Sequence, residues 1–194
     1  MDSGERETRP ALTLDDAGEA VGVRVTDSRH AGNDFAHARL TDVELVRCDL
    51  SGCDFSESVW RRVTLVDCRV SSVDLGQAVL RDVVFAQCRL DAASLRMAQL
   101  RDVRFADAAM QRADFYGAHL EAVSFRGSDL VAADFSGARC KAVDLRGTRL
   151  EGLRGVGSLA GATIGFDQVV FLAPDLARAV GLEVRPDEDD DSDA

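Results

Sequence analysis

The sequence has few of the features that mark an enzyme or a metal protein. It contains three histidines and no Cys-x-x-Cys pair, and no histidine stands at metal-ligand spacing from a cysteine or a carboxylate. It has neither a GxxxxGK[ST] phosphate loop nor a GxSxG motif. Residues 155–160 match the dinucleotide-binding pattern only in form, because no strand–helix–strand unit surrounds them. We therefore expect no enzyme activity, metal, cofactor or small-molecule substrate.

Long apolar runs are also missing. No stretch of 18 apolar residues is present, and the acidic N-terminus lacks the apolar segment of a signal peptide. Five cysteines in such a chain are typical of reduced thiols inside the cell. We expect a cytoplasmic protein without a membrane segment, in which the cysteines serve as packing residues.

What the sequence does contain is an unbroken five-residue repeat. Every fifth residue from Phe35 to Leu150 is large, 24 positions in all, and most are Leu or Phe. The residue two places earlier is small in nearly every unit. A period of five fits neither an α-helix nor a strand, so the chain has to turn within each unit. The small and the large residue then point inward from a short extended piece, and the next pair forms a corner. Stacked corners of this kind predict a solenoid.

Two units show the repeat most clearly: residues 113–117 (Ala-Asp-Phe-Tyr-Gly) and 133–137 (Ala-Asp-Phe-Ser-Gly). They resemble the A(D/N)LXX consensus of the pentapeptide repeat family. Membership implies an all-β solenoid, a right-handed quadrilateral β-helix with twenty residues per coil. The sequence supports that period independently, because five aspartates recur at intervals of twenty or forty: Asp34, Asp54, Asp74, Asp114 and Asp134. We predict about six regular coils and one irregular coil.

The two ends of the chain depart from the repeat. The register breaks after Leu150, and apolar residues at helical spacing over 166–181 predict a short helical cap that stops at Gly181. Pro174 is expected either to kink that helix or to begin a second one. We predict an acidic N-terminal tail over 1–22, a β-helix over 23–165, a helical cap and dimerisation segment over 166–185, and an acidic disordered tail over 186–194.

The C-terminal segment narrows the resemblance. Residues 159–164 (Leu-Ala-Gly-Ala-Thr-Ile), the pair Asp167-Gln168 and the pair Gly181-Leu182 are similar to the end of the fluoroquinolone-resistance members of the family. Those members are DNA mimics that bind DNA gyrase, and their C-terminal helical segments join two rods end to end. The resemblance therefore implies a homodimer, for which the sequence offers six apolar candidates: Phe166, Val169, Val170, Phe171, Leu172 and Leu176.

The net charge of −11 is concentrated at the ends of the chain. Residues 1–22 carry −4 and residues 187–194 carry −6, which leaves about −1 for residues 23–186. With twenty residues per coil, one side of the rod displays one base, Arg96, and six acids: Asp34, Asp54, Glu57, Asp74, Asp114 and Asp134. The next side displays four acids (Asp42, Asp82, Asp102 and Glu121) and seven bases: Arg39, Arg61, Arg62, Arg81, Arg101, Arg139 and Lys141.

The acidic row allows two interpretations. It imitates a DNA backbone for a partner such as gyrase or another type II topoisomerase, or its aspartates only bond locally in each repeat. The first interpretation predicts a gyrase-binding DNA mimic that protects the enzyme from quinolone-like inhibitors or modulates it. The alternative is a generic protein-interaction scaffold with an unrelated partner. Neither predicts direct nucleic-acid binding by this chain.

Overall fold

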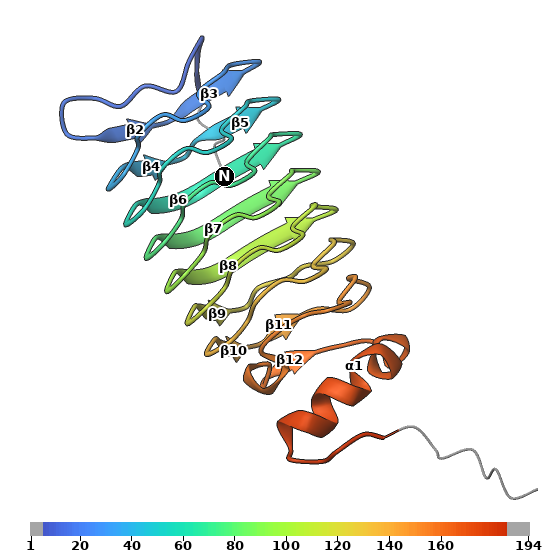
Figure 1. Ribbon diagram of the computed structural model, residues 1–194. Coiled ribbons are helices and arrows are strands. Elements are labelled where there is room, and N and C mark those ends of the chain that lie inside the picture. Colours follow the sequence, from blue (N-terminus) through green and yellow to red (C-terminus); the bar gives the residue numbers. More distant parts are fainter. Residues whose placement is uncertain (1–5, 186–194) are drawn as a thin grey trace, which may run out of the picture.

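A computed structural model describes residues 6–185 of the protein. These residues form a parallel β-solenoid of about eight turns, with one α-helix at the C-terminal end (Figure 1). The solenoid predicted from the repeat is confirmed. Within this part of the chain, no helix is long and apolar enough to cross a membrane.

The strands are short and lie on two sides of each coil, and the two helices lie near the C-terminal end. In chain order they are β1 (Glu7–Arg9), β2 (Glu19–Val21), β3 (Val23–Thr26), β4 (Arg39–Thr41), β5 (Glu44–Val46), β6 (Val59–Val66), β7 (Val79–Ala86), β8 (Gln99–Ala106), β9 (His119–Glu121), β10 (Arg139–Lys141), β11 (Val143–Asp144), the 3-10 helix η1 (Val156–Ser158), β12 (Ala162–Thr163) and α1 (Phe166–Ala179). The remaining two sides are held by single bridges between coils.

The register of the strands confirms the twenty-residue coil. Trp60 in β6 pairs with Leu80 in β7, which pairs in turn with Leu100 in β8. Neighbouring parallel strands lie about 4.8 Å apart, so residues twenty apart form columns along the rod. A charge at one position therefore meets the charge twenty residues away.

The corners depend on a backbone conformation that the repeat alone does not reveal. Every fifth residue from Gly22 to Gly152 has a positive φ, and most of these residues are not glycine. At many corners the turn is closed by a backbone hydrogen bond, as between the Ala38 N–H and the Phe35 carbonyl at 3.1 Å. The left-handed residue lets the chain change direction by one side of the coil.

The core consists of the inward small and large side chains. Almost all the predicted inward positions are buried, including all the phenylalanines from Phe35 to Phe135. Phe85, Phe105 and Phe125 stack in one column with ring centroids 5.0 Å apart. Trp60 is fully buried and lies edge-on to Phe55. These contacts make the core continuous from coil to coil.

The N-terminal segment is not the solvated tail that its charge suggested. From residue 6 onward it belongs to the solenoid, because β1 pairs with β3 and β2 pairs with β4. Leu12 and Ala20 are buried, at 3% and 1% exposure. This segment supplies hydrogen-bond partners to an edge that would otherwise be open. The predicted acidic tails over residues 1–5 and 186–194 lie outside the described residues.

The C-terminal helix covers the last coil, as predicted. Gln168 fixes its start, since the side chain accepts a hydrogen bond from the Gly165 N–H and donates to the carbonyls of Leu145 (2.8 Å) and Thr148 (2.7 Å). Leu172 is 2% exposed and packs into the core. These contacts attach α1 to the end of the solenoid.

Pro174 neither divides α1 nor begins a second helix. The helix is continuous from Phe166 to Ala179. Pro174 removes the N–H that would bond to the carbonyl of Val170, and Val170 lies on the exposed face, where water can take that acceptor. The predicted stop at Gly181 is confirmed: its φ is +83°, and the Leu182 N–H bonds to the Ala177 carbonyl, as in a Schellman motif.

Candidate functional site

The acidic row expected from the sequence is a single column on one side of the solenoid. Single bridges connect Asp34 to Asp54, Asp54 to Asp74, and Asp114 to Asp134, and Ser94 occupies the gap in the middle. The spacing between neighbouring members is that of adjacent coils, about 4.8 Å. The structure therefore brings the five predicted aspartates into one line.

Each aspartate of the column also has a local role. One carboxylate oxygen accepts a hydrogen bond from the backbone N–H two residues later, at 2.8–2.9 Å in all five cases. This is the Asx turn expected if the aspartates only stabilise the repeat. The hydrogen bonds from Ser56 lower the pKa of Asp54 below its ordinary value. Asp34 and Asp74 keep an exposed carboxylate beside this local bond, whereas Asp54, Asp114 and Asp134 are half-buried.

The column has two electrostatically different halves. In the C-terminal half, Asp114 pairs with Arg96 at 2.7 Å and Asp134 pairs with Arg154 at 3.1 Å. In the N-terminal half, Asp34, Asp54 and Asp74 form no ion pair with any residue from 6 to 185.

Glu57 stands beside the unpaired half. Its side chain is 55% exposed, and its carboxylate lies 3.7 Å from His37. The carboxylates on this side that have no arginine or lysine partner among residues 6–185 are therefore those of Asp34, Asp54, Glu57 and Asp74, which we call the acidic patch. Asp114 and Asp134, also expected on the acidic face, are largely neutralised.

Sequence analysis missed Arg154 because this residue follows the last regular unit. The structure continues the aspartate column through a bridge from Asp134 to Arg154. Arg96 was counted, but its reach across one coil to Asp114 was not predicted. Its guanidinium also lies over the ring of Tyr116, 4.5 Å from the centroid.

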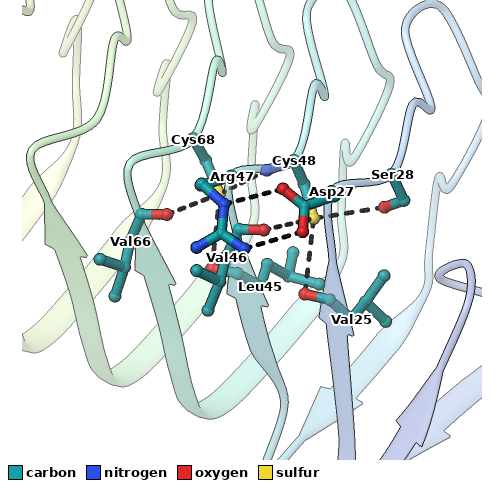
Figure 2. Close-up of polar contacts among 9 residues, drawn as sticks. All are labelled: Val25, Asp27, Ser28, Leu45, Val46, Arg47, Cys48, Val66 and Cys68. Carbon is teal, nitrogen blue, oxygen red and sulfur yellow. Dashed lines mark hydrogen bonds and ion pairs between the residues drawn. The ribbon is translucent and has the colours of Figure 1, made fainter.

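On several sides, bases are stacked on acids one coil earlier. Six ion pairs have this geometry, with distances from 2.6 to 3.3 Å: Glu19–Arg39, Asp27–Arg47, Asp42–Arg62, Glu121–Lys141, Asp129–Arg149 and Asp134–Arg154. Figure 2 shows the Asp27–Arg47 pair bridging two successive coils through both guanidinium nitrogens that face the carboxylate. Such pairs offset the repulsion that stacked like charges would otherwise cause.

Four of the five cysteines, Cys48, Cys53, Cys68 and Cys88, are buried, as predicted, and Cys140 is half-buried. The Cys48 thiol lies near the carbonyls of Val25 and Val46, and its own N–H points at the Cys68 sulfur, 3.3 Å away (Figure 2). The interaction of the Cys48 thiol with the neighbouring Cys68 thiol, together with burial, raises the pKa of the Cys48 thiol. A thiol held in its protonated form is a poor nucleophile and a poor metal ligand. Among residues 6–185, no cluster of three or more His, Cys, Asp or Glu side chains could hold a metal ion.

The predicted dimerisation residues divide into two groups. Phe166, Val170 and Phe171 are exposed by 93%, 71% and 66%, and Val169 and Leu176 by 39% and 38%. Leu172 was expected on this surface, but it is buried under the helix because it faces the last coil. The outer face of α1, defined by Phe166, Val169, Val170 and Phe171, is thus an exposed apolar surface.

Comparisons with known proteins agree with the architecture. Residues 22–57 match the family model described as pentapeptide repeats (8 copies), and residues 60–135 match the model described as pentapeptide repeat region. No curated protein matches the sequence.

Solved structures of the same architecture are similar to this one. A trypsin-treated variant of QnrB1, a plasmid-mediated fluoroquinolone resistance protein, is 17% identical over 86% of this chain and 97% of that chain, with a TM-score of 0.50. Full-length QnrB1 is 20% identical over 80% of this chain and 91% of that chain, with a TM-score of 0.45. HetL, a pentapeptide repeat protein involved in heterocyst differentiation regulation from the cyanobacterium Nostoc, is 20% identical over 74% of this chain and 84% of that chain, with a TM-score of 0.19.

Proposed function

Because this chain belongs to the pentapeptide repeat family, we propose that it is a protein-interaction solenoid that binds DNA gyrase or another type II topoisomerase as a DNA mimic. The observation that carries this proposal is the acidic patch, in which carboxylates without an arginine or lysine partner in the described residues follow one side of a narrow rod. Such a row presents the charge of a phosphate backbone to a basic DNA-binding surface. Binding there protects the enzyme from quinolone-like inhibitors or modulates its activity.

The ion pairs in the C-terminal half of the aspartate column limit the proposed contact surface to the N-terminal half. Asp114 and Asp134 already satisfy Arg96 and Arg154, so a basic partner gains less by meeting them. The proposed contact surface is therefore centred on Asp34, Asp54, Glu57 and Asp74.

The test uses gyrase supercoiling with increasing amounts of protein, with and without a fluoroquinolone. In the variant Asp34→Asn/Asp54→Asn/Asp74→Asn, the amide oxygen can still accept the turn hydrogen bond while the charge is lost. We expect the variant to need at least ten times more protein for the same inhibition or protection.

A matched control carries Asp49→Asn/Asp129→Asn/Asp144→Asn. These three aspartates make the same local turn bond but lie on other sides of the coil. Equal loss of effect in both variants would contradict a role for the acidic patch. No effect of the native protein at any concentration would leave the alternative, a scaffold for an unrelated partner.

We further propose that the protein forms a homodimer through the outer face of α1. The support is the apolar surface of Phe166, Val170 and Phe171, which the last coil does not cover. A two-fold contact between two such faces would bury it and join two solenoids at their C-terminal ends.

A further inference from the structure

The basic side of the solenoid contains a hollow of about 310 Å³ that runs along the rod. Two columns of side chains form its walls. One contains Gln99, His119 and Arg139, and the other contains Arg81, Arg101, Glu121 and Lys141. We call this hollow the basic groove. It spans four coils, about 14 Å at the coil spacing, which is the length of four or five extended residues.

The groove has more positive charge than its own acids can neutralise. Glu121 is its one acid, and it is occupied by Lys141 at 2.6 Å. Arg101 makes only long contacts, 3.6 Å to Asp102 and 4.0 Å to Glu121. Arg81 and Arg139 form no ion pair with a residue of the described segment, 6–185.

The stacking in this column differs from that of the six cross-coil ion pairs. Arg61, Arg81 and Arg101 occupy the same position in three successive coils, so Arg81 lies between two arginines, and Arg101 lies between Arg81 and Glu121. All three side chains are exposed. Like charges at one-coil spacing repel, and an extended anion in the groove would offset that repulsion. Guanidinium groups favour carboxylates, which they bind through two parallel hydrogen bonds.

A run of carboxylates of this length exists in the chain itself. Residues 187–193 read Asp-Glu-Asp-Asp-Asp-Ser-Asp and contain six acids. The described chain ends its helix close to the groove: Ala179 and Val180 line an apolar hollow with Leu159 and Ala160. The next residue after Ala160, Gly161, lies against Cys140, which lines the groove. A Cβ atom at Gly161 would lie 2.5 Å from the Cys140 carbonyl oxygen.

A short segment connects the helix to the acids. The Leu182 N–H is bonded to the Ala177 carbonyl, so four residues, 183–186, lie between this anchor and Asp187, and a fully extended chain over that interval spans up to about 17 Å. A short flexible tether keeps a segment at an effective concentration on the order of millimolar, so even weak charge pairing gives substantial occupancy. The groove and the acidic segment are also opposite in charge, which favours their association.

We propose that the basic groove binds the acidic segment 187–193 of the same chain. The bound segment shields the arginines of the groove from other polyanions, so it acts as a built-in competitor. It leaves the acidic patch, on the neighbouring side of the coil, free for a partner.

The test measures binding of a fluorescent peptide, Asp-Glu-Asp-Asp-Asp-Ser-Asp-Ala, by fluorescence anisotropy at low salt. The native protein is compared with a variant in which all six acids of the segment become amides: D187N, E188Q, D189N, D190N, D191N and D193N. We expect the peptide to bind the neutralised variant at least ten times more tightly, because its groove is no longer occupied. Equal binding to both proteins would overturn the proposal.

A second pair of variants locates the site in the neutralised background. Arg81→Gln/Arg139→Gln should abolish peptide binding, whereas Arg69→Gln/Arg89→Gln should preserve it. The control also removes two exposed arginines, and Arg69 and Arg89 are neighbours in one column on another side. Thermal unfolding verifies that both variants fold. An equal loss of peptide affinity in both double variants would contradict specific binding in the groove. Tighter binding of duplex DNA than of the peptide would identify a nucleic-acid site instead.

Discussion

At the scale of single residues, His30 is the most unusual polar group in the interior. Its side chain is 5% exposed, and its Nε2 atom accepts a hydrogen bond from the Leu12 N–H at 3.1 Å and lies 2.9 Å from the Ser28 hydroxyl. An acceptor nitrogen carries no proton, so the ring is neutral here. Burial lowers the pKa of His30 below its ordinary value. His30 thus connects the N-terminal segment, through Leu12, to the first coils.

This arrangement predicts a specific dependence of stability on pH. Because the pKa of His30 is lower in the folded state, the unfolded chain takes up the proton first as the pH falls. The stability due to His30 is complete above the ordinary pKa, about 6.5, and declines below it by up to about 1.4 kcal/mol per pH unit until the folded pKa is reached. Urea unfolding at pH 7.5, 6.5 and 5.5 measures this slope.

The substitution His30→Gln should remove most of that slope, since an amide does not titrate. Its oxygen can still accept a hydrogen bond from Leu12. The variant His119→Gln provides the comparison, because it removes an exposed histidine outside the core. If native protein and His30→Gln lose stability in parallel between pH 7.5 and 5.5, other groups determine the pH dependence.

At the scale of elements, the corners of the coil carry a recurrent conformational cost. A non-glycine residue with φ near +55° is strained by roughly 1–2 kcal/mol, and the structure contains such residues at most corners. Ala92 occupies one of them, with φ +55°, and its neighbour Ala93 points into the core with 0% exposure. The two alanines are adjacent in sequence and opposite in role.

This contrast predicts opposite effects of the same substitution. Ala92→Gly should stabilise the protein by roughly 0.5–1 kcal/mol, because relief of strain exceeds the added chain entropy of glycine. Ala93→Gly should destabilise it by about 1 kcal/mol, through a lost buried methyl group and greater unfolded-state entropy. Chemical unfolding of the two variants measures the change in the free energy of unfolding. Equal destabilisation by both substitutions would show that the corner at Ala92 is unstrained.

The repeat made most of the fold predictable, for a physical reason. A large residue every five positions and a small one two places earlier determine which atoms face inward, and the coil length follows from the recurrence of the aspartates. The ends were less predictable. Residues 6–22 lack the repeat, so their pairing with β3 and β4 left no periodic signal, and their acids suggested a solvated tail instead.

The same limit applies to the candidate site. Counting residues by side located the aspartate column correctly, but it gave no information on which charges touch. The pairing of Asp134 with Arg154 depends on a residue beyond the regular units, and the burial of Leu172 depends on how α1 is rotated on the last coil. Helical spacing indicated an apolar face, but the contacts of Gln168 with Leu145 and Thr148 determine which part of it turns inward.

At the scale of the whole molecule, function depends on which surfaces remain uncovered. The solenoid has an acidic patch on one side, a basic groove on the next and an apolar helix face at its C-terminal end. These surfaces are carried by one rigid, continuous core, so substitutions at one should not disturb the others. The gyrase, peptide and assembly measurements can therefore be interpreted separately.

The proposed dimer gives the last of these tests. Phe166→Ser/Val170→Ser/Phe171→Ser removes the exposed apolar groups of α1 but leaves the anchors Gln168 and Leu172 in place. We expect the native protein to be a dimer at micromolar concentration and the triple variant to dissociate at least one hundred times more readily, because aromatic anchors dominate such interfaces. Light scattering measures both masses.

As a control, Leu172→Ala should lower thermal stability, because it removes a buried side chain that attaches α1 to the last coil. A native protein that is monomeric at this concentration would exclude the dimer, and the apolar face of α1 would then have to serve a different contact.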